Sequence, residues 1–448
     1  MKRGVVLGGS VAGLLVARVL TDHADEVVVV DRDDLPEGPV DRRGVPQGTQ
    51  VHGLLARGLE QMEALLPGFT TELAEDGAEV ADPGADLRWH VNGEGKPPAP
   101  IGPGVACTRP FLEWHLRRRI QALDGVRTLQ ARGEGLTAQD GRVDGVLLTE
   151  PGGGGGGQRL AADLVVDCTG RSSRIDEWLV SLGYEPPPRR TVTVDLGYAS
   201  RFYPRRPDDL LDGARAVISI TESLRRPRGA AAFPVEGGRW LVTVGAYHHD
   251  RPTSEPEDFA ARLAEDPAPA LHPFAGRDDA LTDVATYRYP ASVRRDYHRC
   301  PRLPRGLLAA GDAVASFNPL YGQGMTSAAL HAATLGSYLG SGASVHAPAG
   351  SYFRRLRPVI DSVWKLSTSA DFRLPHVTGD RPPGLWVTHR LTDLYTRATL
   401  EDADLHGLFL RVLNLQTRPE QLARPDHLTR AWRASRRRRR RKRAAAAS

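Results

Sequence analysis

A glycine-rich turn near the amino terminus constrains the fold more than any other feature of this chain. Residues 8–13 read Gly-Gly-Ser-Val-Ala-Gly, between the apolar run 4–7 and a helical pattern of apolar residues that continues through Val19. This is a variant of the G-x-G-x-x-G motif with Ser10 at the middle glycine, and the motif presents the amides of a helix N-terminus to a pyrophosphate. We expect five residues of the turn to bind one: Gly8, Ser10, Val11, Ala12 and Gly13.

A second apolar run, residues 27–30, is β-branched throughout and ends at Asp31, 18 residues after Gly13. Strand, glycine turn, helix and strand make a βαβ unit, which predicts a parallel sheet. An acidic residue at roughly 20 residues from the turn binds the ribose hydroxyls of a dinucleotide. We therefore expect Asp31 and the adjacent Arg32 to contact a cofactor, which on these features alone is NAD, NADP or FAD.

The block 306–325 decides among these cofactors. Residues 306–312 read as a buried strand that ends in Gly311-Asp312, and a proline- and glycine-containing turn follows before an Ala-rich helix. The block resembles the FAD-dependent monooxygenases of the aromatic-hydroxylase superfamily, the relatives of p-hydroxybenzoate hydroxylase. The resemblance implies that Gly311 and Asp312 hold the ribityl chain of FAD. It also implies that the isoalloxazine lies against five residues of the turn: Pro319, Gly322, Gln323, Gly324 and Met325.

Further segments support the same superfamily. The segment 163–174 resembles its middle fingerprint, with Asp-Cys-Thr-Gly at 167–170 in place of Asp-Gly, a variant shared with reductase and halogenase branches. Segments 42–48 (RRGVPQG) and 108–113 (TRPFLE) are similar to those of bacterial flavin epoxidases of polyether-antibiotic pathways. A guanidinium offers paired donors to phosphate oxygens, and the likeness implies three residues near FAD: Arg43, Gln47 and Arg109.

The resemblance also implies an activity. Reduced FAD would react with O₂ to give a C4a-hydroperoxide, whose distal oxygen enters a large apolar secondary metabolite by epoxidation or hydroxylation. Because the flavin carries this chemistry, we assign no catalytic residue. We place Phe317, Asn318 and Tyr321 beside the substrate, since they immediately precede the flavin-binding glycines. Only one dinucleotide motif occurs, so electrons come from NAD(P)H bound without its own Rossmann fold or from a separate flavin reductase.

Two other functions stay open at this point, and a third, the halogenase, is disfavoured. An FAD-dependent C=C reductase of the geranylgeranyl-reductase type shares the Asp-x-Thr-Gly block. A flavin halogenase would carry a Trp-x-Trp motif, which is absent, and an active lysine, for which the four lysines at 2, 96, 365 and 442 are poor candidates. A phosphate-binding adaptor would use the run 436–443, in which eight consecutive residues are basic.

Composition excludes several classes of protein. The net charge is +5, but eight basic residues lie at 436–443, so the rest of the chain carries −3 and offers no basis for specific nucleic-acid binding. Cys107, Cys168 and Cys300 form no C-x-x-C pair, and we expect no metal site. No run approaches the roughly 18 apolar residues of a membrane span, and we expect a cytoplasmic protein.

The predicted fold class is α/β, with a Rossmann-like FAD-binding domain of the glutathione-reductase type, an inserted antiparallel sheet domain and a helical C-terminal region. The alternation of polar and apolar residues in 191–200 and 239–247 is typical of antiparallel strands. The expected boundaries are 1–85, 101–182 and 285–345 for the FAD domain, 86–100 and 183–284 for the substrate domain, 346–432 for the helical region, and 433–448 for a disordered Arg-rich tail.

Overall fold

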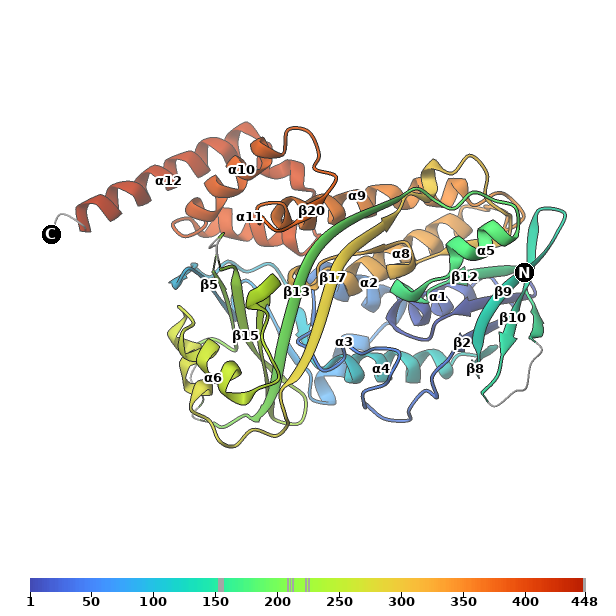
Figure 1. The fold of residues 1–448 in the computed structure, drawn as a ribbon, viewed down its shortest axis with the longest axis horizontal. Coiled ribbons are helices and arrows are strands. Elements are labelled where there is room, and N and C mark those ends of the chain that lie inside the picture. Colours follow the sequence, from blue (N-terminus) through green and yellow to red (C-terminus); the bar gives the residue numbers. More distant parts are fainter. Residues whose placement is uncertain are drawn as a thin grey trace.

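The computed structural model describes residues 1–445 except 152–156, 208, 210, 212, 222, 223 and 225. Figure 1 shows an α/β part that contains the N-terminus, a second sheet with α6 (Pro256–Ala264) at its outer side, and a group of C-terminal helices. Two long strands, β13 (Arg189–Pro204) and β17 (Ala285–Arg295), run between the first two parts. The predicted fold class is therefore confirmed.

The α/β part is built on a five-stranded parallel sheet in the order β18-β12-β1-β2-β8. The strands are β1 (Arg3–Leu7), β2 (Glu26–Asp31), β8 (Val126–Gln130), β12 (Leu164–Asp167) and β18 (Leu307–Ala309). Val5, Val6, Val28 and Val29 are fully buried, as expected of a parallel sheet covered on both faces. Parallel strands end at one common edge, so the turns after β1, β12 and β18 meet there.

Helices and small sheets surround this sheet. Helix α1 (Val11–Thr21) packs against α4 (Arg109–Gln121) and α8 (Gly324–Gly340). The other helices of this part are α2 (Ala56–Leu65), α3 (Phe69–Glu75) and α5 (Ile175–Ser181). One three-stranded antiparallel sheet contains β9 (Arg132–Gln139), β10 (Arg142–Thr149) and β11 (Gln158–Ala161). Another contains β3 (Gly53–Leu54), β4 (Glu79–Ala81) and β7 (Gly104–Ala106).

A nine-stranded sheet forms the second part, in the order β19-β17-β13-β16-β15-β14-β5-β6, with β20 paired to β13. Its remaining strands are β5 (Leu87–Val91), β6 (Glu94–Gly95), β14 (Ala216–Thr221), β15 (Arg228–Val235), β16 (Arg239–Tyr247), β19 (Ala315–Ser316) and β20 (Thr378–Gly379). The prediction of a purely antiparallel sheet is wrong at one pair, because β5 and β14 run parallel. A parallel pair needs a long connection, and 124 residues separate the ends of these two strands.

The expected boundary at residue 285 lies too early. Residues 285–295 form β17, which pairs with β13 from Ser200–Ala285 to Arg189–Arg295. The strand therefore belongs to the nine-stranded sheet, and the FAD domain resumes only after it. One continuous strand passes from one part to the other, so the sequence carries no break in composition at the border.

The C-terminal helices are α9 (Gly350–Asp371), α10 (Leu385–Ala398), α11 (Ala403–Leu413) and α12 (Pro425–Ala445). Helix α9 packs against α8 of the α/β part, whereas α10, α11 and α12 lie above the second sheet in Figure 1, where α12 extends away from the body. Of the helices in the described ranges, none has the length and apolar character needed to cross a bilayer.

The prediction of a disordered tail is wrong for residues 433–445, which continue helix α12, while 446–448 lie outside the described residues. The helix packs against α10, and Ala434 is fully buried. Arg438 pairs with Glu94 and Glu401, and Lys442 lies 2.7 Å from Glu94. These basic residues are spaced i and i+4, so they share one face of the helix.

Candidate functional site

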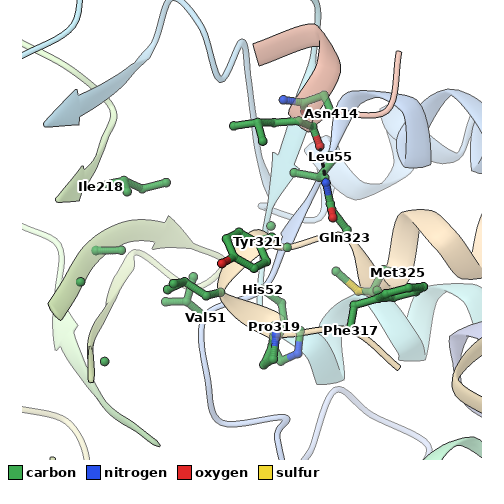
Figure 2. Close-up of a pocket in the computed structure, with 18 of the residues that line it drawn as sticks. Val51, His52, Leu55, Ile218, Phe317, Pro319, Tyr321, Gln323, Met325 and Asn414 are labelled. Carbon is green, nitrogen blue, oxygen red and sulfur yellow. Dashed lines mark hydrogen bonds between the residues drawn. The ribbon is translucent and has the colours of Figure 1, made fainter. Parts of the chain in front are cut away.

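A cavity of about 990 Å³ lies at the carboxyl edge of the parallel sheet and extends to the nine-stranded sheet and the C-terminal helices. Ligand sites of α/β proteins occupy this edge, and their volumes are about 300–1,000 Å³. Figure 2 shows Tyr321 and Val51 in the space that faces Ile218 of β14, with Asn414 above them at the end of α11. All three parts of the chain thus contribute to the lining of this cavity.

The N-terminal turn forms one end of this cavity. Ser10 caps α1, and the first intrahelical bond runs from Leu14 N to Ser10 O at 2.9 Å. The amides before Leu14 have no partner inside the helix, and Ser10, Val11 and Ala12 line the cavity. Gly13 is required by packing, because a Cβ built on it would lie 1.7 Å from Gly8 O. The helix start therefore presents amides and a partial positive charge to the cavity.

Asp31 stands directly behind this turn. Its Oδ2 accepts a hydrogen bond from Gly9 N at 2.6 Å, and its Oδ1 accepts from Asp33 N at 2.9 Å. Asp31 is buried and does not line the cavity, whereas the neighbouring Arg32 does. The carboxylate thus fixes the turn from the end of β2.

A buried charge cluster flanks the same end of the cavity. Glu113 of α4 accepts from Arg42 at 2.7 Å, from Ser10 Oγ at 2.7 Å and from Arg109 Nε at 3.3 Å. Burial alone would raise the pKa of Glu113, but Arg109 and Arg42 lower it below its usual value. Arg109 Nη2 also donates to Ser10 Oγ at 2.7 Å, and Arg109 lines the cavity. The cluster holds Arg109 against the N-terminal turn.

The Gly-Asp pair after β18 lies across from that turn. Gly311 has a φ of +63°, and a Cβ on it would lie 2.6 Å from the Cβ of Ala12. Its amide donates to His331 Nδ1 of α8 at 2.9 Å. Burial lowers the pKa of His331 to about 3, so the imidazole is neutral and accepts this bond. The contact fixes Gly311 at the point where the two turns touch.

The carboxylate of Asp312 lines the cavity. No residue in the described ranges donates a hydrogen bond to it. Burial raises the pKa of Asp312, against the nearby positive charges of Arg171 and Arg109. Asp312 is half-buried and its carboxylate has free acceptor capacity toward the cavity, so it fits a ligand that brings hydroxyl groups.

The segment 163–174, which contains the middle fingerprint, forms the cavity wall between these two turns. Asp167 at the end of β12 is fully buried and accepts from Thr169 N at 2.9 Å and from the Ser173 hydroxyl. These bonds shape the loop that brings Thr169 and Arg171 to the cavity. The guanidinium of Arg171 lies 4.2 Å from the centroid of the Tyr289 ring.

The far end of the cavity is formed by the turn before α8. Gly322 has a φ of +67°, and a side chain at Gly324 would project into open space. The first bond of the helix runs from Ser327 N to Gln323 O at 2.8 Å, which leaves the amides of Gly324 and Met325 free of intrahelical partners. Gln323 Nε2 donates to Leu413 O at 3.1 Å and so ties the turn to α11 (Figure 2).

Most of the residues predicted from the sequence meet at this cavity. It is lined by Ser10, Val11, Ala12, Arg32, Gln47, Arg109, Gly311, Asp312, Phe317, Pro319, Tyr321, Gly322, Gln323, Gly324 and Met325. Gly8, Gly13 and Asp31 lie behind the wall and shape it. Arg43 is exposed and outside the lining, and the adjacent Arg42 takes the inward position instead. Asn318 is fully buried and lies outside the lining.

The sequence motifs did not predict the part of the lining that the C-terminal helices contribute, which we call the upper wall. Side chains of α10, α11 and the short helix Pro419–Ala423 line the cavity there, including Leu391, Tyr395, Phe409 and Leu422. Each comes from an ordinary amphipathic helix, which carries no motif. Lys96 and Lys365, two of the four lysines considered poor candidates for the active lysine of a halogenase, also line the cavity. The ammonium of Lys96 lies 5.0 Å from the Phe409 ring.

The model of the FAD binding domain family matches residues 3–352. The chain belongs to this family. Protein Rv3254 of Mycobacterium tuberculosis is 34% identical to it over 425 residues, which cover 92% of this chain and 89% of that protein. The assignment confirms the predicted FAD cofactor, the prediction of an FAD-dependent oxidoreductase and the superfamily that the motifs resemble.

Solved structures agree with this family fold. The flavin-dependent brominase Bmp2 superposes with a TM-score of 0.67 at 14% identity, covering 92% of each chain. PqsL, a probable FAD-dependent monooxygenase from Pseudomonas aeruginosa, gives 0.59 at 17% identity, covering 83% of this chain and 97% of that one. A mutant of 2-methyl-3-hydroxypyridine-5-carboxylic acid oxygenase gives 0.61 at 20%, covering 83% and 92%. At these identities the likeness shows the fold.

The residues of this flavoprotein fit FAD. The free amides of α1 and the adjacent Arg109 suit the pyrophosphate, since anions bind at helix N-termini. The unpartnered carboxylate of Asp312 suits the ribityl hydroxyls. The open space beside Gly324 and the amides of α8 suit a flat ring with polar edges.

We predict that Gly311→Ala lowers FAD occupancy at least tenfold while the protein stays folded. The new Cβ would press on Ala12 and would need the left-handed φ that alanine disfavours. FAD content after desalting measures the effect. Gly276→Ala is the matched control, because Gly276 has a φ of −98° and a Cβ built on it would meet no atom within 4 Å. Unchanged occupancy in Gly311→Ala would contradict the placement of FAD.

Proposed function

We propose that this protein is an FAD-dependent monooxygenase that inserts one oxygen atom of O₂ into an apolar small molecule, by hydroxylation or epoxidation. The observation that carries the proposal is the continuity of the cavity. It leads from the dinucleotide turn past Pro319 into a chamber walled by Trp89, Ile218 and Phe409. One pocket therefore has a site for the cofactor and an apolar site for a second molecule.

Bound FAD, once reduced, supplies the activation of O₂. The chain itself has three tasks. The turns at Ser10 and Gly311 fix the cofactor along the sheet edge, and the turn Pro319–Gly324 holds its ring end. The upper wall, with Leu391 and Phe409, excludes bulk water, which favours oxygen transfer over release of hydrogen peroxide. No side chain needs to react covalently.

Electrons for this reaction come from NAD(P)H that binds transiently or from a separate flavin reductase. The supporting observation is that residues 8–13 are the one dinucleotide motif of the sequence. An adaptor that binds phosphates through residues 436–443 is disfavoured, because Arg438, Arg441 and Lys442 pair with Glu94 and Glu401 of the same chain.

The proposal is tested with the FAD-loaded protein, NADH or NADPH, and ¹⁸O₂. The substrate panel holds terpenoid alkenes and fused aromatic compounds, with and without added bromide. We expect a product that carries one ¹⁸O atom and forms only when O₂ is present. Anaerobic formation of a product reduced at a C=C bond would favour the reductase. A halogenated product that forms only with bromide would favour a brominase reaction, for which Lys96 and Lys365 are lysines that line the cavity.

A further inference from the structure

One side of helix α12 is attached to the body of the protein. Ala434 is fully buried there, and the helix packs against α10. Arg438 and Lys442, one turn apart on this side, both pair with Glu94 of β6. Arg438 also lies 3.5 Å from Glu401, which precedes α11. These ion pairs neutralise the positive charges that face the body.

The opposite side of α12 is a row of arginines, which we call the basic face. Residues spaced by three, four and seven positions share one side of a helix. Among the described residues, no carboxylate forms an ion pair with any arginine of this face. Asp402 and Asp426, beside the first turns of α12, pair with Arg430 and Arg424 instead. The basic face consists of Arg433, Arg436, Arg437, Arg440 and Arg443, all of them exposed.

The charges of the basic face repel one another. Like charges four positions apart destabilise a helix, and Arg433 with Arg437 and Arg436 with Arg440 are such pairs. Helix α12 extends away from the body in Figure 1, and the arginines of this side are open to solvent. A partner that brings many negative charges would therefore be attracted to the face and would relieve the repulsion.

An aromatic side chain lies at the edge of the basic face. Trp432 is 52% exposed, and the guanidinium of Arg436 lies 4.7 Å from the centroid of its ring. Tryptophan is enriched at the level of lipid headgroups, because its ring is apolar and its N–H is polar. Arginine offers paired donors to a phosphate group. A helix side with several arginines and an exposed tryptophan is typical of attachment to an anionic membrane surface.

The position of the basic face relative to the cavity favours a membrane over a nucleic acid. Arg397 Nε of α10 donates to Ser435 Oγ of α12 at 3.2 Å, which joins the two helices. Leu391 and Tyr395 of α10 line the cavity, whereas no described residue of α12 does. A membrane on the basic face would therefore lie close to the upper wall. Apolar molecules concentrate in membranes, so this arrangement would supply the cavity with them.

We propose that the basic face and Trp432 bind the surface of a membrane that contains anionic lipids, and that this attachment holds the cavity near a source of its apolar substrate. The choice of a membrane rests on the proposed function, because a nucleic acid would bring no apolar substrate. The charge of the face and its lack of acidic partners do not depend on that function.

Flotation of the FAD-loaded, full-length protein with vesicles tests the proposal, and flavin absorbance reports the bound fraction. Vesicles of phosphatidylcholine are compared with vesicles that also contain phosphatidylserine. We expect at least tenfold tighter binding to the anionic vesicles, and loss of this binding at high salt, because salt screens exposed charges. Equal binding to the two kinds of vesicle, or binding to neither, would overturn the proposal.

A combined variant assigns the binding to the basic face. Each basic residue near an anionic surface contributes about fivefold in affinity, so removing four of them should weaken binding by at least about thirtyfold. The control removes the same number of charges at exposed positions outside α12, and it should keep nearly full binding. An equal loss in both would show that net charge alone matters and would overturn the assignment. The variant carries Arg436→Gln, Arg437→Gln, Arg440→Gln and Arg443→Gln, and the control carries Arg132→Gln, Arg159→Gln, Arg189→Gln and Arg302→Gln.

Two further measurements complete the test. Replacing the same four arginines of the basic face by lysine keeps the charge and should retain most of the vesicle binding, which a loss through misfolding would not. Duplex DNA and single-stranded RNA are titrated at the phosphate concentration of the anionic vesicles, and tighter binding of either would replace the membrane by a nucleic acid. Because vesicle binding is measured without reductant or substrate, its failure is distinguishable from a failure of ¹⁸O incorporation.

Discussion

Asp312→Ala is expected to leave the purified protein with less than a tenth of the FAD that the unchanged protein holds. The carboxylate is half-buried at the cavity wall, and no described residue donates a hydrogen bond to it. Hydrogen bonds to a charged group contribute about 1.5–3 kcal/mol each, so losing even one lowers affinity by roughly tenfold or more. Visible absorbance after desalting measures the occupancy.

Two further variants make this result specific. Asp312→Asn keeps one acceptor oxygen and should retain an intermediate amount of FAD. Asp124→Ala changes an exposed aspartate outside the cavity and should retain all of it. Full occupancy in Asp312→Ala, with the thermal stability unchanged, would remove the ribityl chain from this position.

Glu113→Ala is expected to lower the free energy of unfolding by about 3–5 kcal/mol. Glu113 is buried between Arg42 and Arg109, and removing one member of a buried ion pair leaves uncompensated charge. Chemical denaturation of the FAD-free protein, followed by tryptophan fluorescence, measures the change. The FAD-free form is used because cofactor binding would itself add to the stability.

The control for this variant is Glu177→Ala. Glu177 is an exposed glutamate of α5 that pairs with Arg174 at 2.8 Å, and exposed pairs contribute about 0–1 kcal/mol. If the two alanine variants lose the same stability, then solvent reaches the Glu113 cluster. Glu113→Gln should fall between them, since its amide oxygen can still accept from one arginine.

Most of the residues predicted to bind the cofactor line one cavity, because each belongs to a local sequence pattern. A Cβ at Gly13 would meet the backbone of Gly8, and one at Gly311 would meet the Cβ of Ala12 at a left-handed φ, so these sites accept few residue types. Arg43 is exposed, whereas Arg42 is turned inward, because the chain turns at Arg43-Gly44 and the two side chains point in different directions. Nothing in the pair Arg42-Arg43 says which one faces Asp33 and Glu113.

The remaining errors come from contacts between distant segments. Asp371 lies 53 residues after Asn318, and only the fold brings the carboxamide of Asn318 to the carboxyl group of Asp371. The parallel pairing of β5 with β14 likewise joins segments that no short pattern connects. The tail seemed too charged to fold, but its helix has acidic partners at Glu94 and Glu401, more than 30 residues away in each case.

The paired strands β13 and β17 limit how this molecule can open. They share a ladder from Ser200–Ala285 to Arg189–Arg295 that spans both halves of the body, so bending one half against the other would break many backbone hydrogen bonds at once. The helices above the cavity are joined to the nine-stranded sheet by fewer backbone hydrogen bonds, such as those of the short pairing of β20 with β13. Passage of a bulky molecule therefore depends on swinging those helices aside, and a crosslink from α10 to the sheet should slow its entry without altering how FAD is held.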